Sequence, residues 1–91
     1  MYKKSLKRMI NETKVFPEEH IIELKGISPF LVGRIVITQG QKGFDAEIDI
    51  IQTESGKIYN HVGIIYGEFD SREAFNLGVH QLKQFLLKKI N

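Results

Sequence analysis

The hydrophobic and polar positions between Phe44 and Ile50 alternate without a break. Four apolar side chains in this segment are separated by three carboxylates, Asp45, Glu47 and Asp49. Because successive side chains of a β-strand point to opposite faces of its sheet, the pattern predicts a strand with one buried face and one acidic face. This strand orients the sheet, and the flanking segments predict its neighbours.

A second strand is predicted over residues 30–39, joined to the alternating strand by a four-residue hairpin loop. Pairing Ile35 with Ile48 sets two isoleucines opposite each other on the buried face. A slip of one residue would instead set Ile37 opposite Asp45, so burial selects the first register.

The strand that follows Gly56 is predicted to pair with the other side of the alternating strand. Residues 54–56 form a short turn in which glycine occupies the position that requires a positive φ. The resulting register directs Val62 and Ile64 to the buried face and leaves Ile65 on the opposite face.

Both ends of the chain have the periodicity of helices. Residues 2–13 carry apolar side chains three or four positions apart among lysines, which predicts a short basic helix, and a strand near residues 20–25 follows. Asp70 or Ser71 can cap a long helix whose apolar stripe runs from Phe75 to Ile90, and Asp70 with Glu73 resembles a capping box. The predicted fold class is α+β: a four-stranded antiparallel β-meander with a long C-terminal helix packed on one face and a short basic N-terminal helix.

Composition narrows the class of protein. With 91 residues, 42% of them hydrophobic and 26% charged, the chain is expected to form one globular domain over residues 1–91. No apolar run approaches the ~20 residues that span a bilayer, and no export signal follows the basic N-terminus. We therefore expect a cytoplasmic protein with no membrane partner. The absence of cysteine excludes disulfides and thiolate catalysis.

Positive charge is concentrated at the N-terminus. Residues 1–14 contain five lysines and arginines against Glu12 alone, whereas the rest of the chain is slightly acidic. The solvated face of a helix is the favoured interpretation. A nucleic-acid partner is the alternative, and its contacts would come from the basic residues Lys3, Lys4, Lys7 and Arg8.

The predicted register also brings three polar residues into one row on the face opposite the core: Arg34, Asp49 and His61. Directly opposed side chains lie about 5 Å apart at Cβ, so Arg34 can neutralise Asp49, and Asp49 can accept a hydrogen bond from His61. With Glu47 and Tyr59 nearby, these are the candidate binding residues of the sheet.

This row lacks the partners that catalysis needs. A carboxylate that orients a histidine requires a nucleophile, and neither a cysteine nor a serine in a strand-to-helix elbow is present. Asp49, Glu47 and His61 could offer metal ligands, but the zinc-binding spacings are missing and Arg34 competes with a cation. We therefore predict no catalytic residues, no cofactor and no metal, and interpret the row as a cross-strand salt-bridge network.

The expected function is that of a small non-enzymatic binding or adaptor protein. Apolar residues lie among charges on the face opposite the core, which is typical of a protein-protein interface, here between copies of the chain in a homodimer. The apolar residues predicted for this face are Val32, Val36, Ile51, Tyr59 and Ile65. Nucleic-acid binding through the basic N-terminal helix remains the alternative.

Overall fold

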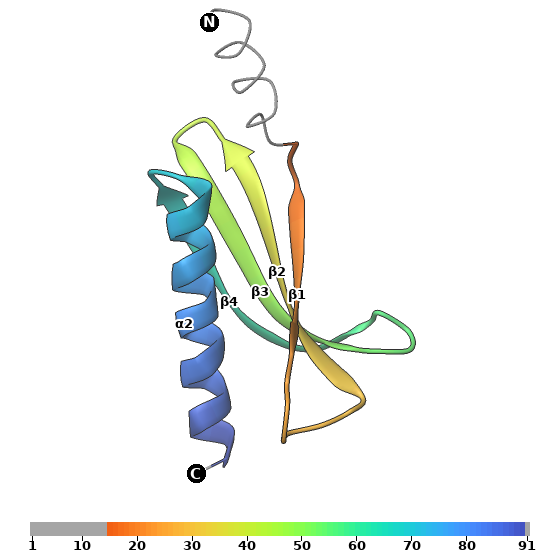
Figure 1. Cartoon of the computed structure of the whole chain (residues 1–91). Helices are drawn as coiled ribbons and strands as arrows, with labels where there is room; N and C mark the ends of the chain where they lie inside the picture. Colours follow the sequence, from red (N-terminus) through yellow and green to blue (C-terminus); the bar gives the residue numbers. More distant parts are fainter. Residues whose placement is uncertain (1–14, 91) are drawn as a thin grey trace, which may run out of the picture.

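The computed structural model describes residues 15–90, with the side chains of residues 15–88. Four antiparallel strands follow one another in an open sheet of order β1-β2-β3-β4, and a long helix follows (Figure 1). The elements are β1 Glu18–Glu23, β2 Leu31–Gly40, β3 Gly43–Gln52, β4 Ile58–Glu68 and α2 Ser71–Ile90. This layout confirms the α+β class and the meander. The helix predicted over residues 2–13 lies outside the described residues.

The predicted register between β2 and β3 is confirmed. Ile35 pairs with Ile48 and Ile37 pairs with Ala46, and all four side chains are fully buried. The hairpin is tighter than predicted, because the strands continue to a Gly40–Gly43 pair and leave only residues 41 and 42 in the turn. Alternation excludes a slip of one residue, because that register would set the carboxylates of β3 opposite the buried isoleucines of β2.

The predicted register between β3 and β4 holds at two adjacent positions, Asp49–His61 and Ile50–Asn60, and is wrong on either side of them. Asp49 pairs with His61 as expected, but Ile48 pairs with Gly63, so Val62 has no direct partner on β3. One strand therefore contributes an extra residue at this point, which is a β-bulge. A bulge reverses the inside-outside alternation of the residues that follow it up to the next irregularity, which here lies between the pairs Ala46–Ile65 and Phe44–Glu68.

The bulge changes which isoleucine belongs to the core. Ala46 pairs with Ile65, and Ile65 is 8% exposed and packs in the core, whereas Ile64 is 41% exposed. Both predicted orientations are therefore wrong, because the extra residue shifts the alternation by one position. Ile64 instead pairs with Glu47 on the face opposite the core.

A second irregularity lies near the turn between β3 and β4. Ile51 pairs with Ile58 instead of the predicted Tyr59, which is left between paired positions. Gly56 has the predicted positive φ, 73°, but the Gln52 amide donates to the Lys57 carbonyl at 2.9 Å, so Gln52 and not Thr53 closes the turn. The register error at Tyr59 therefore begins at the turn, and the irregularity between Ile50 and Ile51 restores the predicted pairing at Asn60.

Helix α2 begins at a side-chain cap and packs on one face of the sheet. The Glu73 amide donates a hydrogen bond to Oδ1 of Asp70 at 2.7 Å, which confirms the predicted cap. Gly78 lets the helix approach closely, because a Cβ there would lie 3.2 Å from Cγ2 of Ile35. Leu82, which is nearly fully buried, completes the contact with the core.

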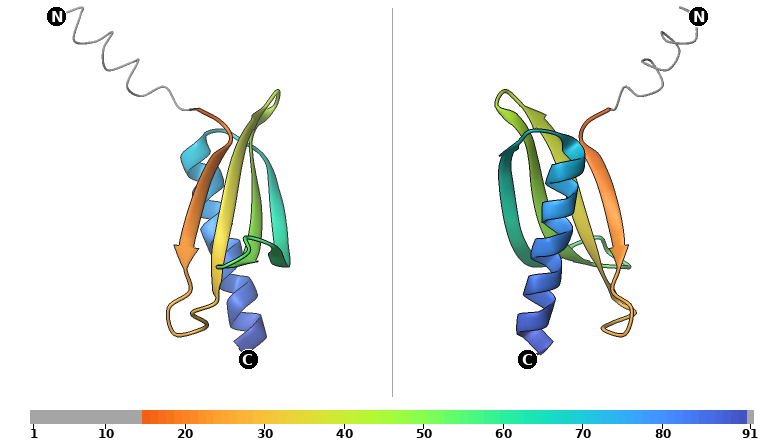
Figure 2. Two further views of the ribbon diagram at one scale, coloured as in Figure 1. Left: turned by 90° about the vertical axis from the view of Figure 1, so that its right-hand side faces the viewer. Right: turned by 60° about the vertical axis from the view of Figure 1, so that its left-hand side comes forward.

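Among residues 15–90, no helix lies against the other face of the sheet (Figure 2). We call this surface the open face. Its side chains alternate with those of the core, and they come from all four strands: Glu19, Ile21, Val32, Arg34, Val36, Glu47, Asp49, His61 and Ile64.

Candidate functional site

The three residues of the predicted row lie side by side on the open face. Arg34 pairs with Asp49 and Asp49 pairs with His61, each across neighbouring strands. His61 Nδ1 donates a hydrogen bond to Oδ1 of Asp49 at 2.8 Å, since an ionised carboxylate can only accept. Nη2 of Arg34 lies 3.7 Å from the other oxygen, Oδ2. The contacts anticipated from the register are therefore present.

Asp49 is fully buried although it belongs to the open face. The side chains on either side of it are not: Arg34 is 23% exposed and His61 is 51% exposed. Two atoms of this group, Oδ2 of Asp49 and Nε of Arg34, are buried and have no hydrogen-bond partner. Burying a carboxylate raises the free energy of the folded state unless the charge is paired. The neighbours of Asp49 must therefore compensate its charge.

Glu47 joins the same group from the next outward position of β3. Its Oε2 lies 4.0 Å from Nδ1 of His61. The pKa of Glu47 is raised above its ordinary value, because its protonated form can donate a hydrogen bond to Asp49 and because the Asp49 charge repels its ionised form. The nearby His61 and Arg34 act in the opposite direction without reversing the shift. We call Arg34, Glu47, Asp49 and His61 the polar cluster.

The other predicted site residues do not belong to this cluster. Tyr59 lines a hollow of about 410 Å³ near the turn between β3 and β4, together with Phe30 and Gln52. The four basic residues proposed for nucleic acid, Lys3, Lys4, Lys7 and Arg8, lie outside the described residues. The structure thus brings together four of the five predicted open-face residues.

Two apolar residues beside the polar cluster were missed at the level of sequence. Ile21 of β1 pairs with Arg34 and is 53% exposed, and Ile64 of β4 pairs with Glu47. The alternation of β1 could have placed Ile21 on the open face, because Ile22 and Leu24 are predicted to face the core. The spacing of apolar residues in β4 could not have placed Ile64 on the open face, because the bulge before it shifts the alternation by one position.

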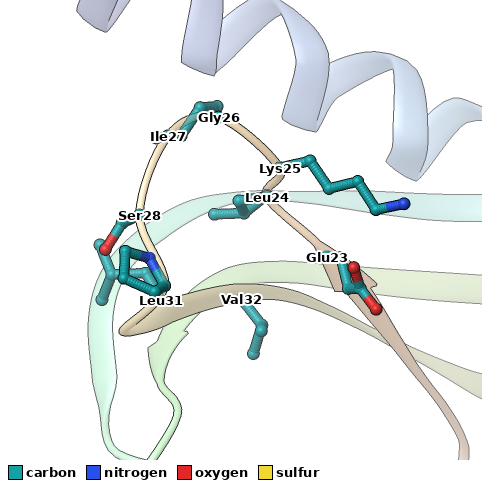
Figure 3. Close-up of a pocket in the computed structure, with 9 residues that line it drawn as sticks. Glu23, Leu24, Lys25, Gly26, Ile27, Ser28, Leu31 and Val32 are labelled. Carbon is teal, nitrogen blue, oxygen red and sulfur yellow. The ribbon is translucent and has the colours of Figure 1, made fainter.

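A second hollow, of about 490 Å³, lies beside the connection between β1 and β2. Figure 3 shows Leu24 turned toward the inside of this loop, whereas Lys25 points away from it. Oγ of Ser28 already accepts a hydrogen bond from the Phe30 amide. The hollow contains no member of the polar cluster and no set of converging polar groups, so it does not resemble an active site.

Comparisons with protein-family models, with curated proteins and with solved structures find no match to this chain. Any function must therefore be argued from the geometry of the chain itself. Within the described residues, no helix has the length and apolar character needed to cross a bilayer.

Proposed function

We propose that this chain is a small non-enzymatic binding protein that self-associates through its open face. The observation that carries the proposal is the exposure of Ile21 and Ile64 beside the charges of the polar cluster. Apolar side chains rimmed by polar groups on a face with no cover are typical of a protein-protein interface.

The two edges of the sheet support a second copy as the occupant. The edge strand β1 is short and carries Glu18, Glu19 and Glu23, which oppose pairing with another strand. The other edge strand, β4, has eleven residues and contains neither lysine nor proline. Apart from its β-bulges, which interrupt pairing locally, β4 carries none of the charges seen on β1 except Glu68, so its edge favours association at the β4 side of the open face.

Charge on the open face is compatible with two-fold symmetry. Arg34 and His61 lie beside the acidic Glu19 and Glu47. In a symmetric dimer the same patch meets itself, so a patch that carries both signs of charge can set unlike charges opposite each other.

Sedimentation of the purified full chain tests this proposal. We expect a dimer, and we expect Ile64→Glu to convert it to a monomer because the carboxylate would be buried in the interface. Leu87→Glu is the matched control, since Leu87 is also an exposed leucine-sized side chain but lies on α2, and it should leave the dimer intact.

Two results would contradict the proposal. A wild-type chain that remains monomeric at about millimolar concentration has no self-association of this kind. A dimer that survives Ile64→Glu with unchanged stability uses another surface.

The alternative function, nucleic-acid binding, is supported by the charge of residues 1–14. Replacing Lys3, Lys4, Lys7 and Arg8 together by glutamine tests it in the full chain. If this alternative is correct, affinity for mixed DNA or RNA falls steeply with added salt and is lost in the variant, because phosphate contacts release counterions. Binding that ignores salt, or that survives the four substitutions, excludes it.

A further inference from the structure

Three potential metal ligands converge in the polar cluster. The ligand atoms of Glu47, Asp49 and His61 all lie within 4.8 Å of one another. Oxygen and nitrogen ligands of a tetrahedral zinc ion lie about 3.4 Å apart, given bond lengths near 2.1 Å. The distances from His61 Nδ1 to Asp49 Oδ1 and to Glu47 Oε2 are 2.8 and 4.0 Å, on either side of that value. Small side-chain rotations therefore suffice to reach the required spacing.

The charge of this region is not balanced by the protein. Arg34 is shared, because its guanidinium lies 3.7 Å from Glu19 and 3.7 Å from Asp49. With Glu47 included, three carboxylates face the single guanidinium of Arg34, an excess of two carboxylates. A divalent cation matches that excess and would relieve the repulsion between Glu47 and Asp49.

Burial of Asp49 provides an independent indication. Its side chain is fully buried at the centre of the cluster, yet Oδ2 has no hydrogen-bond partner. In native proteins, nearly all buried polar atoms are satisfied, and buried charges are paired or coordinate metals. Oδ2 faces the Arg34 guanidinium at 3.7 Å, too far for a hydrogen bond, so a cation at Oδ1 would lower the charge of the whole carboxylate and relieve part of the cost of burying Oδ2.

Arg34 is compatible with a cation at this place. It faces Oδ2 of Asp49, whereas His61 faces Oδ1, so the arginine and a metal ion can use different oxygens of one carboxylate. A charged neighbour that orients a ligating carboxylate from behind is a common feature of metal sites. Arg34 therefore competes with a cation for Asp49 less strongly than the sequence suggested.

We propose that Glu47, Asp49 and His61 form a binding site for a divalent transition-metal ion, with Zn²⁺ best matched to the ligands. Imidazole nitrogen with carboxylate oxygen suits zinc, whereas Mg²⁺ and Ca²⁺ prefer oxygen alone. On metal binding, Nδ1 of His61 would lose the proton that it donates to Asp49 and Nε2 would carry the ring proton instead, so that the Nδ1 lone pair is free to coordinate the ion. Glu47 and His61 are half-exposed, so water can complete the coordination.

Calorimetric titration of the full chain with zinc chloride near pH 7 tests the site. We expect one ion per chain with a Kd of about 10 µM or tighter. Glu47→Gln and His61→Ala should each weaken binding by about tenfold or more, because each removes one of three ligands. Both side chains are half-exposed, so these variants should fold, and circular dichroism verifies this.

The chain provides a matched control in a second histidine–carboxylate pair. His20 Nε2 lies 2.8 Å from Oε1 of Glu18, yet no third ligand accompanies them among the described residues. His20→Ala should therefore leave zinc affinity unchanged. Ile64→Ala, which removes an apolar contact of the proposed interface without adding a charge beside Glu47, should also leave it unchanged. The latter separates this proposal from self-association.

Several results would overturn the assignment. A Kd weaker than about 100 µM, or equally tight binding of Mg²⁺, would indicate only adventitious attraction to exposed carboxylates. Unchanged affinity in His61→Ala would place the ion elsewhere. One ion per two chains that is lost in Ile64→Glu would indicate a site between copies instead of one within the chain.

Discussion

At the scale of single residues, Asp49 has the most unusual environment in the described part of the chain. The outward side of β3 is exposed at Glu47, but Asp49 and Ile51 on the same side are buried, so this carboxylate is enclosed among apolar neighbours. Hydrogen bonding from His61 and the charge of Arg34 offset part of the desolvation cost. The stability of the sheet and the chemistry of the open face therefore depend on the same side chain.

Asp49→Ala should lower the free energy of unfolding by about 3 kcal/mol, since it leaves part of the Arg34 charge buried without its partner. Glu47→Ala is the matched control, two residues away on the same face but half-exposed, and should change stability by about 0.5 kcal/mol or less. Urea unfolding with a chelator present measures both. Equal losses would mean that the burial of Asp49 has no energetic consequence.

At the scale of elements, the bulge in β4 determines which side chains enter the core. Beyond Val62 the strand turns Ile65 inward and Ile64 outward. Helix α2 lies close to this point, because a Cβ at Gly63 would come within 2.6 Å of Oε1 of Gln81. The bulge, the glycine and the helix therefore fit together as one packing unit.

Adjacent isoleucines give a direct test of the bulge. Ile65→Ala should cost about 3 kcal/mol because it leaves a cavity in the core, whereas Ile64→Ala should cost about 0.5 kcal/mol in the monomer. Chemical denaturation of dilute protein compares the two. The unbulged register makes the opposite prediction, so a larger loss for Ile64→Ala would show that β4 alternates without interruption.

At the scale of the whole molecule, one helix covers one face of a four-stranded sheet, and the second face has no cover within residues 15–90. A domain of this size buries a small core, so each additional apolar contact has a large relative effect on its stability. Burial of the open face in a dimer would add such contacts.

Self-association should therefore make the thermal midpoint depend on protein concentration. We expect Tm to rise as the wild-type chain is concentrated, because mass action stabilises the associated folded state. The Ile64→Glu variant should show no such rise. A wild-type midpoint that is constant over a hundredfold range of concentration, about 1 to 100 µM, would contradict association linked to folding.

The sequence by itself determined the order of elements, the face of β3 that enters the core and the cap of α2. Each depends on local rules: alternation between Phe44 and Ile50 allows one register that buries isoleucine, and Asp70 can bond the first amides of the helix wherever that helix packs. The pair of Arg34 and Asp49 followed from the same register, whereas the pair of Asp49 and His61 came from the separate register of β3 and β4, which the structure confirms only at Asp49 and Ile50.

Only the tertiary structure decided the bulge, the exchange of Ile64 for Ile65 and the burial of Asp49. A bulge costs little locally and is selected by how β4 meets α2, so the two-residue period of the sequence contains no sign of it. Burial of a side chain likewise depends on neighbours from other strands. The candidate metal site was thus visible in the sequence as residue types, while the enclosure that favours a cation arises only when the strands are assembled.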